Sequence, residues 1–181
     1  MLTVEGVYGK LSPWEKAVVD PIEKTDAAYV KEWLESPSQG LPFKADDPFT
    51  FFYKGVRMRS MSEVYIATLL DNYNIPFLYE KPLKLAGRVI YPDFSALDMR
   101  NRREVYWEHM GLMDNPGYYQ DAVRKIRSYT YSGIYLGDRL LITQGTSYSG
   151  LDMSEAERLL CWRFGKKNVH FSSKIAGRGG A

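Results

Sequence analysis

Two acidic side chains lie in segments that should pair in one sheet. Asp93 lies in Val89–Leu97, and Glu108 lies in Glu104–Met110, fifteen positions further along the chain. Both segments are rich in β-branched and aromatic residues, and a short turn joins them, so we expect an antiparallel hairpin with the two carboxylates side by side. Adjacent carboxylates repel each other unless positive charge lies between them, and a hard divalent cation such as Mg²⁺ supplies that charge.

Taken singly, each acid has a simpler interpretation, because Asp93 could be a turn residue and Glu108 could face solvent. The neighbours of the two acids are aromatic: Tyr91, Phe94, Tyr106 and Trp107. Such neighbours indicate strands that belong to the core. They favour a buried acidic pair over two surface acids.

The elements that must position this pair follow the order α-β-β-β-α-β. They are a helix beginning after Ser60, strands at Phe77–Leu85, Val89–Leu97 and Glu104–Met110, a helix at Gly117–Tyr131 and a strand at Arg139–Thr143. Short turns make the first three strands antiparallel, whereas a strand that follows a helix can return parallel. The sequence therefore predicts an α/β fold with a mixed sheet flanked by helices. Ser154 and Glu157 have capping-box spacing and predict one more helix, Ser154–Phe164.

The chain of 181 residues is long enough for one domain with a substantial core. Residues 1–48 are expected to form a helical N-terminal extension, with a helix that starts at Thr25. Residues 49–171 are expected to form the main domain, and the glycine-rich residues 172–181 a flexible C-terminal tail.

Composition excludes several classes of protein. The single cysteine, Cys161, rules out a disulfide framework and a zinc site built from several thiolates. No apolar run is long enough for a transmembrane helix, and no apolar leader follows Met1. No phosphate-binding loop, dinucleotide-binding glycine motif or nucleophile elbow is present. These features predict a cytoplasmic protein without a membrane partner, while the net charge of +2 alone does not indicate nucleic acid.

Four sequence blocks resemble the PD-(D/E)xK nuclease superfamily, and in particular a bacterial and phage-type branch whose third strand ends in W-E-H-x-G. The blocks are Arg59-Ser-Met-Ser-Glu63, Tyr79-Glu-Lys-Pro82, Tyr91-Pro-Asp-Phe94 and Tyr106-Trp-Glu-His-Met-Gly111. The resemblance covers about Val56 to Thr143 and implies a restriction-endonuclease-like fold. It also implies Mg²⁺-dependent hydrolysis of phosphodiester bonds, with Mn²⁺ able to substitute.

The resemblance implies a role for each matching residue. Asp93, Glu108 and the backbone carbonyl of His109 would be metal ligands, and Glu63 would be an additional acidic ligand. Glu63 also has capping-box spacing with Ser60, so a purely structural role is an equal alternative. We expect the His109 side chain to be structural, because strand side chains alternate between the two faces of a sheet. Glu80 is expected to form a surface ion pair.

The sequence departs from the family motif at Met110, where the motif has its lysine. A thioether cannot orient a water molecule as an ammonium does. Lys125 could replace it, because Tyr118, Ala122, Lys125 and Tyr129 have the spacing of one helical face. The alternative is a lysine on a solvated helix edge.

Basic side chains flank the predicted site. Arg57, Arg59, Arg102, Arg103 and Arg124 could neutralise phosphates, and Tyr129 could contact nucleic acid, although solvated surface charges are an equal interpretation for the arginines near Arg102.

We therefore expect a metal-dependent nuclease that acts on DNA, with a homodimer as one possible assembly. One alternative is a nucleic-acid-binding domain that kept the fold and lost activity through Met110. A weaker alternative is an assembly module whose tyrosines and tryptophans face a protein partner.

Overall fold

The computed structural model describes residues 3–19, 23–36, 40–43, 50–85 and 87–167. Residues 1–37 and 38–181 form two compact units. The boundary expected near residue 48 and the tail expected at 172–181 lie outside the described residues.

The first unit contains three short helices. They are α1 (Val4–Tyr8), α2 (Pro13–Val18) and α3 (Asp26–Leu34). The helix start expected at Thr25 is confirmed, because its side chain accepts a hydrogen bond from the backbone N–H of Ala28 at 3.2 Å.

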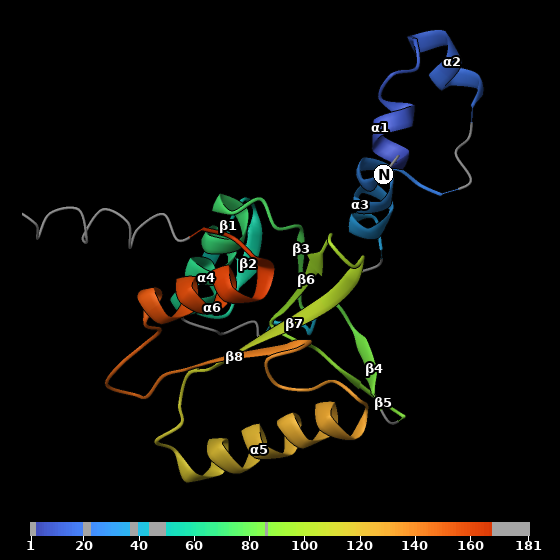
Figure 1. Ribbon diagram of the computed structural model, residues 1–181. Coiled ribbons are helices and arrows are strands. Elements are labelled where there is room, and N and C mark those ends of the chain that lie inside the picture. Colours follow the sequence, from blue (N-terminus) through green and yellow to red (C-terminus); the bar gives the residue numbers. More distant parts are fainter. Residues whose placement is uncertain (1–2, 20–22, 37–39, 44–49, 86, 168–181) are drawn as a thin grey trace, which may run out of the picture. The chain divides into compact units, whose positions relative to one another are not determined.

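The second unit contains the remaining elements. In chain order they are β1 (Phe51–Tyr53), β2 (Val56–Met58), α4 (Met61–Asn72), β3 (Phe77–Tyr79), β4 (Leu83–Leu85), β5 (Arg88–Ile90), β6 (Phe94–Asp98), β7 (Arg103–Met110), α5 (Pro116–Tyr131), β8 (Leu140–Gln144) and α6 (Met153–Phe164). Figure 1 shows this order by colour. None of the helices in the described ranges is both long and apolar enough to cross a lipid bilayer.

The main sheet of this unit has the strand order β3-β6-β7-β8. The pairs β3–β6 and β6–β7 are antiparallel, and β7–β8 is parallel. The mixed α/β architecture expected from the sequence is therefore confirmed. The parallel return of β8 follows from α5, which crosses over between β7 and β8.

Helices cover both faces of the sheet (Figure 1). On one face, α4 and α6 pack against alternate strand residues, among them Phe94, Val105 and Trp107. On the other face, Tyr129 of α5 packs against Tyr106 and Leu140. Side chains two positions apart in a strand lie on the same face of the sheet, so Glu108 lies on the α5 face with Tyr106.

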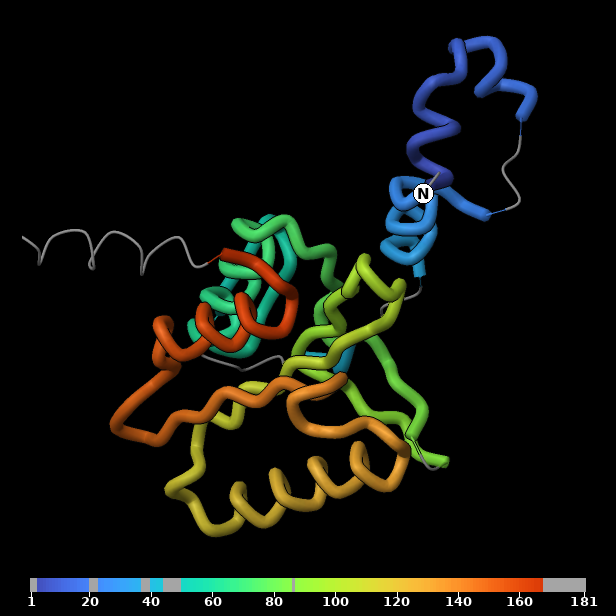
Figure 2. The backbone as a smooth tube through the Cα atoms, in the orientation of Figure 1, coloured from blue at the N-terminus to red at the C-terminus, as the bar shows by residue number. Residues whose placement is uncertain are grey.

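The two strands expected at 77–85 and 89–97 are each interrupted. β3 and β6 belong to the main sheet, whereas β4 and β5 form a separate two-stranded ribbon, which continues the same hairpin (Figure 2). Pairing of Tyr79 with Phe94 and of Leu83 with Ile90 keeps one register across the break. The expectation of continuous strands was wrong, because Glu80 has a φ of 46° and prolines at 82 and 92 donate no ladder hydrogen bond.

The helix α6 begins differently from the prediction. Its N-cap is Asp152, whose carboxylate accepts hydrogen bonds from the N–H groups of Ser154 and Glu155. Glu157, expected to complete a capping box with Ser154, instead is buried and accepts a hydrogen bond from the hydroxyl of Tyr73. Spacing alone therefore placed the cap two residues too late.

A buried carboxylate fastens the end of β6 to α6. Asp98 accepts two hydrogen bonds from the guanidinium of Arg100, at 2.9 and 3.0 Å, and one from Arg163 at 2.7 Å. Burial alone would raise the pKa of Asp98, but the two guanidinium groups outweigh it and hold that pKa well below its ordinary value.

Asp98→Asn should lower the free energy of unfolding at pH 7 by about 2 kcal/mol, because charge-assisted hydrogen bonds to two arginines are weakened. The depressed pKa means that the stabilisation is present above the ordinary aspartate pKa and is lost as the pH falls below about 4. Urea unfolding at pH 7 and pH 3 should therefore show the two proteins converging in acid. An equal gap at both pH values would contradict an ionic role for Asp98.

Candidate functional site

The site is built where the β3–β6 hairpin breaks. The N–H of Glu80 donates to the carbonyl of Asp93 at 3.1 Å, which closes the main-sheet part of the hairpin. Asp93 itself precedes β6, and its Oδ2 accepts a 2.6 Å hydrogen bond from the N–H of His109. The register of Phe94 with Trp107 sets Asp93 opposite Glu108, on the same face of the sheet. At the break, the N–H of His109 thus bonds to the side chain of Asp93 in place of a backbone carbonyl of the neighbouring strand.

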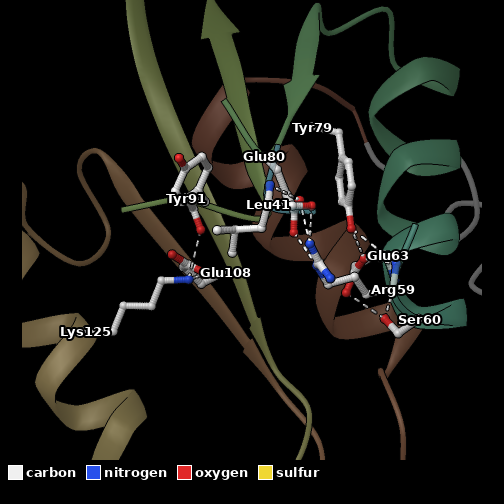
Figure 3. A network of polar contacts seen from close by, with 9 residues as sticks. All are labelled: Leu41, Arg59, Ser60, Glu63, Tyr79, Glu80, Tyr91, Glu108 and Lys125. Carbon is white, nitrogen blue, oxygen red and sulfur yellow. Dashed lines mark hydrogen bonds and ion pairs between the residues drawn. The ribbon is translucent and has the colours of Figure 1, made fainter. Parts of the chain in front are cut away.

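Glu108 is fully buried and is held from α5. Its Oε2 lies 2.6 Å from Nζ of Lys125, and its Oε1 accepts a 2.6 Å hydrogen bond from the hydroxyl of Tyr129. Nζ of Lys125 also donates to the carbonyl of Tyr91 at 3.1 Å (Figure 3). Lys125 therefore lies on the helix face that its spacing predicted, in contact with Glu108. Its side chain is 30% exposed.

The negative charge of Asp93 and Glu108 is only partly balanced by nearby positive charge. Burial raises the pKa of Asp93 well above its ordinary value, and the nearby charge of Glu108 raises it further. Burial also raises the pKa of Glu108, although Lys125 and Tyr129 counteract it. For Lys125, burial would lower the pKa, but Glu108 and Asp93 outweigh it, so the ammonium keeps its proton. One ammonium thus interacts electrostatically with two carboxyl groups, of which Glu108 is buried and Asp93 half-buried.

The backbone carbonyl of His109 is a third oxygen at this position. The backbone of Asp93 forms a hydrogen bond with Glu80, on the β3 side. Backbone groups alternate in direction along a strand, so odd-numbered residues at this end of β6 form backbone hydrogen bonds with β3, and even-numbered residues form them with β7. By the same alternation His109 faces Pro92, which has no N–H. The carbonyl therefore receives no ladder hydrogen bond from that strand.

These donors fit a hard divalent cation. Two carboxylates and a main-chain carbonyl are the oxygen ligands that Mg²⁺ takes, and the raised pKa values show that added positive charge would be stabilising. Within the described residues, no group of three or more histidine, cysteine or acidic side chains is arranged to hold a metal ion. A cation here would therefore depend on the carbonyl and on water to complete its coordination.

The side chain of His109 lies on the opposite face from Glu108. Its Nδ1 lies 3.1 Å from Oγ1 of Thr143, which also accepts a hydrogen bond from Nε1 of Trp107 at 3.2 Å. Burial lowers the pKa of His109, which favours the neutral ring.

Two further acids lie in a separate polar network near α4 (Figure 3). Glu63 accepts hydrogen bonds from the N–H of Arg59, the hydroxyl of Ser60 and the hydroxyl of Tyr79, at 2.8, 3.0 and 2.6 Å. The N–H of Glu63 donates to Ser60, so the capping role is present, and the second half of the capping box goes to Arg59 instead. These contacts satisfy Glu63 without a cation.

Glu80 forms an ion pair, as expected, but the pair is not on the surface. Nε of Arg59 lies 2.6 Å from Oε1 of Glu80, whose side chain is only 6% exposed. Nη2 of Arg59 also donates to the carbonyl of Leu41 at 2.7 Å. The guanidinium of Arg59 therefore already has partners within the protein, although its side chain remains 33% exposed.

The remaining residues predicted to contact nucleic acid lie in different settings. Tyr129 is completely buried against Glu108, so its predicted role as a nucleic-acid contact is wrong. Arg124 forms an ion pair with Asp121 on the solvent-facing side of α5, and Arg103 lies 3.8 Å from Asp138. Those two pairs are solvent-exposed and contribute little to stability.

The structure also places the side chains of Arg57 and Tyr118 and the backbone of Arg102. Arg57 stacks on the ring of Phe43 at 4.3 Å, and Arg102 occupies the turn before β7 with a φ of 47°. The hydroxyl of Tyr118 accepts a 3.2 Å hydrogen bond from the N–H of Gly111. No spacing in the sequence indicated the contact of Lys125 with the Tyr91 carbonyl, because that contact depends on the break in the hairpin.

Comparisons of the chain with protein-family models, with curated proteins and with solved structures found no match. The geometry of the site is therefore the basis for inferring a function.

Proposed function

We propose that residues 38–181 form a restriction-endonuclease-like domain of the PD-(D/E)xK superfamily that hydrolyses phosphodiester bonds in DNA with Mg²⁺. One observation carries the proposal. Lys125 of α5 lies 2.6 Å from the buried carboxylate of Glu108, and the half-buried Asp93 lies opposite Glu108 just before the neighbouring strand. This is the helix face that the sequence predicted for a lysine replacing the one absent at Met110.

Each residue has a chemical role in this proposal. Asp93, Glu108 and the carbonyl of His109 would hold Mg²⁺, which supplies Lewis-acid polarisation of the phosphate and an acidified water when bound. Tyr129 fixes one oxygen of Glu108 from the buried side. Lys125 donates to the other oxygen of Glu108 and to the carbonyl of Tyr91, and it retains its proton. Its third N–H would orient the attacking water and stabilise negative charge on the phosphate.

The test is incubation of the full chain with supercoiled plasmid and with linear DNA, in Mg²⁺, Mn²⁺ or EDTA. Cleavage in either metal and none in EDTA is the expected result. Absence of cleavage in all three conditions, at protein concentrations that bind the DNA, would contradict the proposal.

A second function has a specific observation in its favour. Both oxygens of Glu108 already have hydrogen-bond partners, and Met110 stands where the family motif has lysine. A domain that binds nucleic acid without cleaving it would retain this ion pair as a structural feature. Metal-independent DNA binding without cleavage would favour this function.

A further inference from the structure

The β4–β5 ribbon leaves the main sheet directly at the candidate site. It begins after Glu80 and ends before Asp93, which are bonded to each other at its base. Tyr91, the residue after the ribbon's last strand, accepts the hydrogen bond from Lys125. Any substrate bound by the ribbon would therefore lie beside the candidate site.

One side of the ribbon is fixed to the protein. Leu83, Leu85 and Ile90 pack with the cluster that contains Tyr106 and Tyr129. The outer part is open, because a Cβ added at Gly87 would meet no atom within 4 Å. The ribbon is thus anchored on its α5 side, whereas Gly87 faces open space.

The exposed part of the ribbon is positively charged. Residues 81–92 include three basic residues and no acidic residue. Lys81 is paired with Glu104, whereas Lys84 and Arg88 are exposed and form no ion pair with any described residue. These two side chains are available for an anionic partner.

The two available cations lie on opposite faces of the ribbon. Arg88 shares the face on which Leu85 packs against the protein, but its own side chain is exposed. Lys84 pairs with Val89, and Arg88 pairs with Leu85, so alternation separates Lys84 from Arg88. A groove of duplex DNA has phosphates on both walls, and its major groove admits a two-stranded ribbon.

We propose that the β4–β5 ribbon binds duplex DNA beside the cleavage position, with Lys84 and Arg88 contacting phosphates on the two walls of one groove. The inference rests on the proposed function and assigns its substrate as double-stranded. Five residues separate Arg88 from Asp93, a span of at most roughly 16 Å. The contacts therefore fall within about five base pairs of the cut.

The experiment measures binding of the full chain to a duplex and to a single strand of equal length, by fluorescence anisotropy in EDTA across a salt series. The variant is Lys84→Ala/Arg88→Ala. The control, Lys166→Ala/Lys167→Ala, removes the same charge from exposed residues after α6, which packs on the opposite sheet face. Thermal unfolding of each variant checks that it is folded.

The ribbon variant should bind duplex about 10- to 100-fold more weakly at 0.1 M salt, and its salt slope should fall by about two, as expected for two lost phosphate contacts. The control and the single strand should change less than about threefold. Failure of the wild type to bind duplex, an unchanged salt slope, or an equal loss for the single strand would overturn the proposal.

Cleavage assays on the same proteins separate this inference from the proposed function. If the wild type binds duplex through the ribbon but does not cleave in Mg²⁺, the ribbon assignment stands and the nuclease proposal fails. If the wild type cleaves and the ribbon variant binds and cleaves equally well, the nuclease proposal stands and the ribbon assignment fails.

Discussion

Replacing Lys125 with alanine should lower the rate of Mg²⁺-dependent DNA cleavage by about 10²- to 10³-fold. One positioned proton donor or charge-stabilising group typically contributes this much to catalysis. The ammonium of Lys125 lies 2.6 Å from Glu108 and keeps its proton, so it is the cation available to the reacting phosphate and water. Single-turnover cleavage at saturating Mg²⁺ and DNA measures the effect on the chemical step.

The matched control is Arg124→Ala, which removes a neighbouring positive charge from an exposed pair with Asp121. Its effect should be less than about threefold and should disappear at higher salt. Because loss of Lys125 leaves Glu108 buried without its cation, Lys125→Met is assayed in parallel to keep the side-chain volume. Circular dichroism establishes that both variants are folded. Equal rates for the wild type and both Lys125 variants would show that this lysine has no part in cleavage.

The position of Lys125 was predictable because it depends on one local periodicity. Residues at 118, 122, 125 and 129 share a helical face whatever the rest of the fold does, and an amphipathic helix must turn that face towards the sheet. The same periodicity also implied that Tyr129 faces the sheet. On that face Tyr129 is completely buried, so it cannot make the nucleic-acid contact expected from the sequence.

The break in the hairpin was not predictable in the same way. Val89–Leu97 has the composition of one strand, and the interruption depends on the positive φ of Glu80, an uncommon conformation for a residue with a side chain. Arg59 compensates for it by holding the buried carboxylate of Glu80 from across the fold. Such long-range pairing leaves no spacing signal in the sequence, so the separate β4–β5 ribbon became evident only in the structure.

Asp93→Asn should abolish cleavage while making the metal-free protein more stable. Loss of a carboxylate ligand should reduce the cleavage rate by at least about 10³-fold, because several kcal/mol of metal-assisted stabilisation depend on it. Asparagine still offers an oxygen to the N–H of His109, so the local hydrogen bond can persist. Its neutral side chain removes a buried charge that Glu108 opposes.

The difference in stability between the wild type and Asp93→Asn should depend on pH. Because the pKa of Asp93 is raised in the folded protein, the wild type should lose stability as the pH rises above the ordinary aspartate value near 4, by about 1.4 kcal/mol for each unit of pKa elevation. The asparagine variant lacks this loss. Urea unfolding in EDTA should therefore give similar stabilities at pH 4 and a more stable variant at pH 7.

Adding Mg²⁺ should reverse the order of stability at pH 7. A ligand that binds only the folded state stabilises it by RT ln(1 + [L]/Kd), and only the wild type retains the full oxygen donor set. Unfolding measured over a Mg²⁺ titration should show the wild type rising past a variant whose stability stays constant. A variant that is already less stable than the wild type in EDTA at pH 7 would instead identify Asp93 as a structural acceptor for His109. The acidic pair would then have no need of a cation, and the non-catalytic domain would be the better assignment.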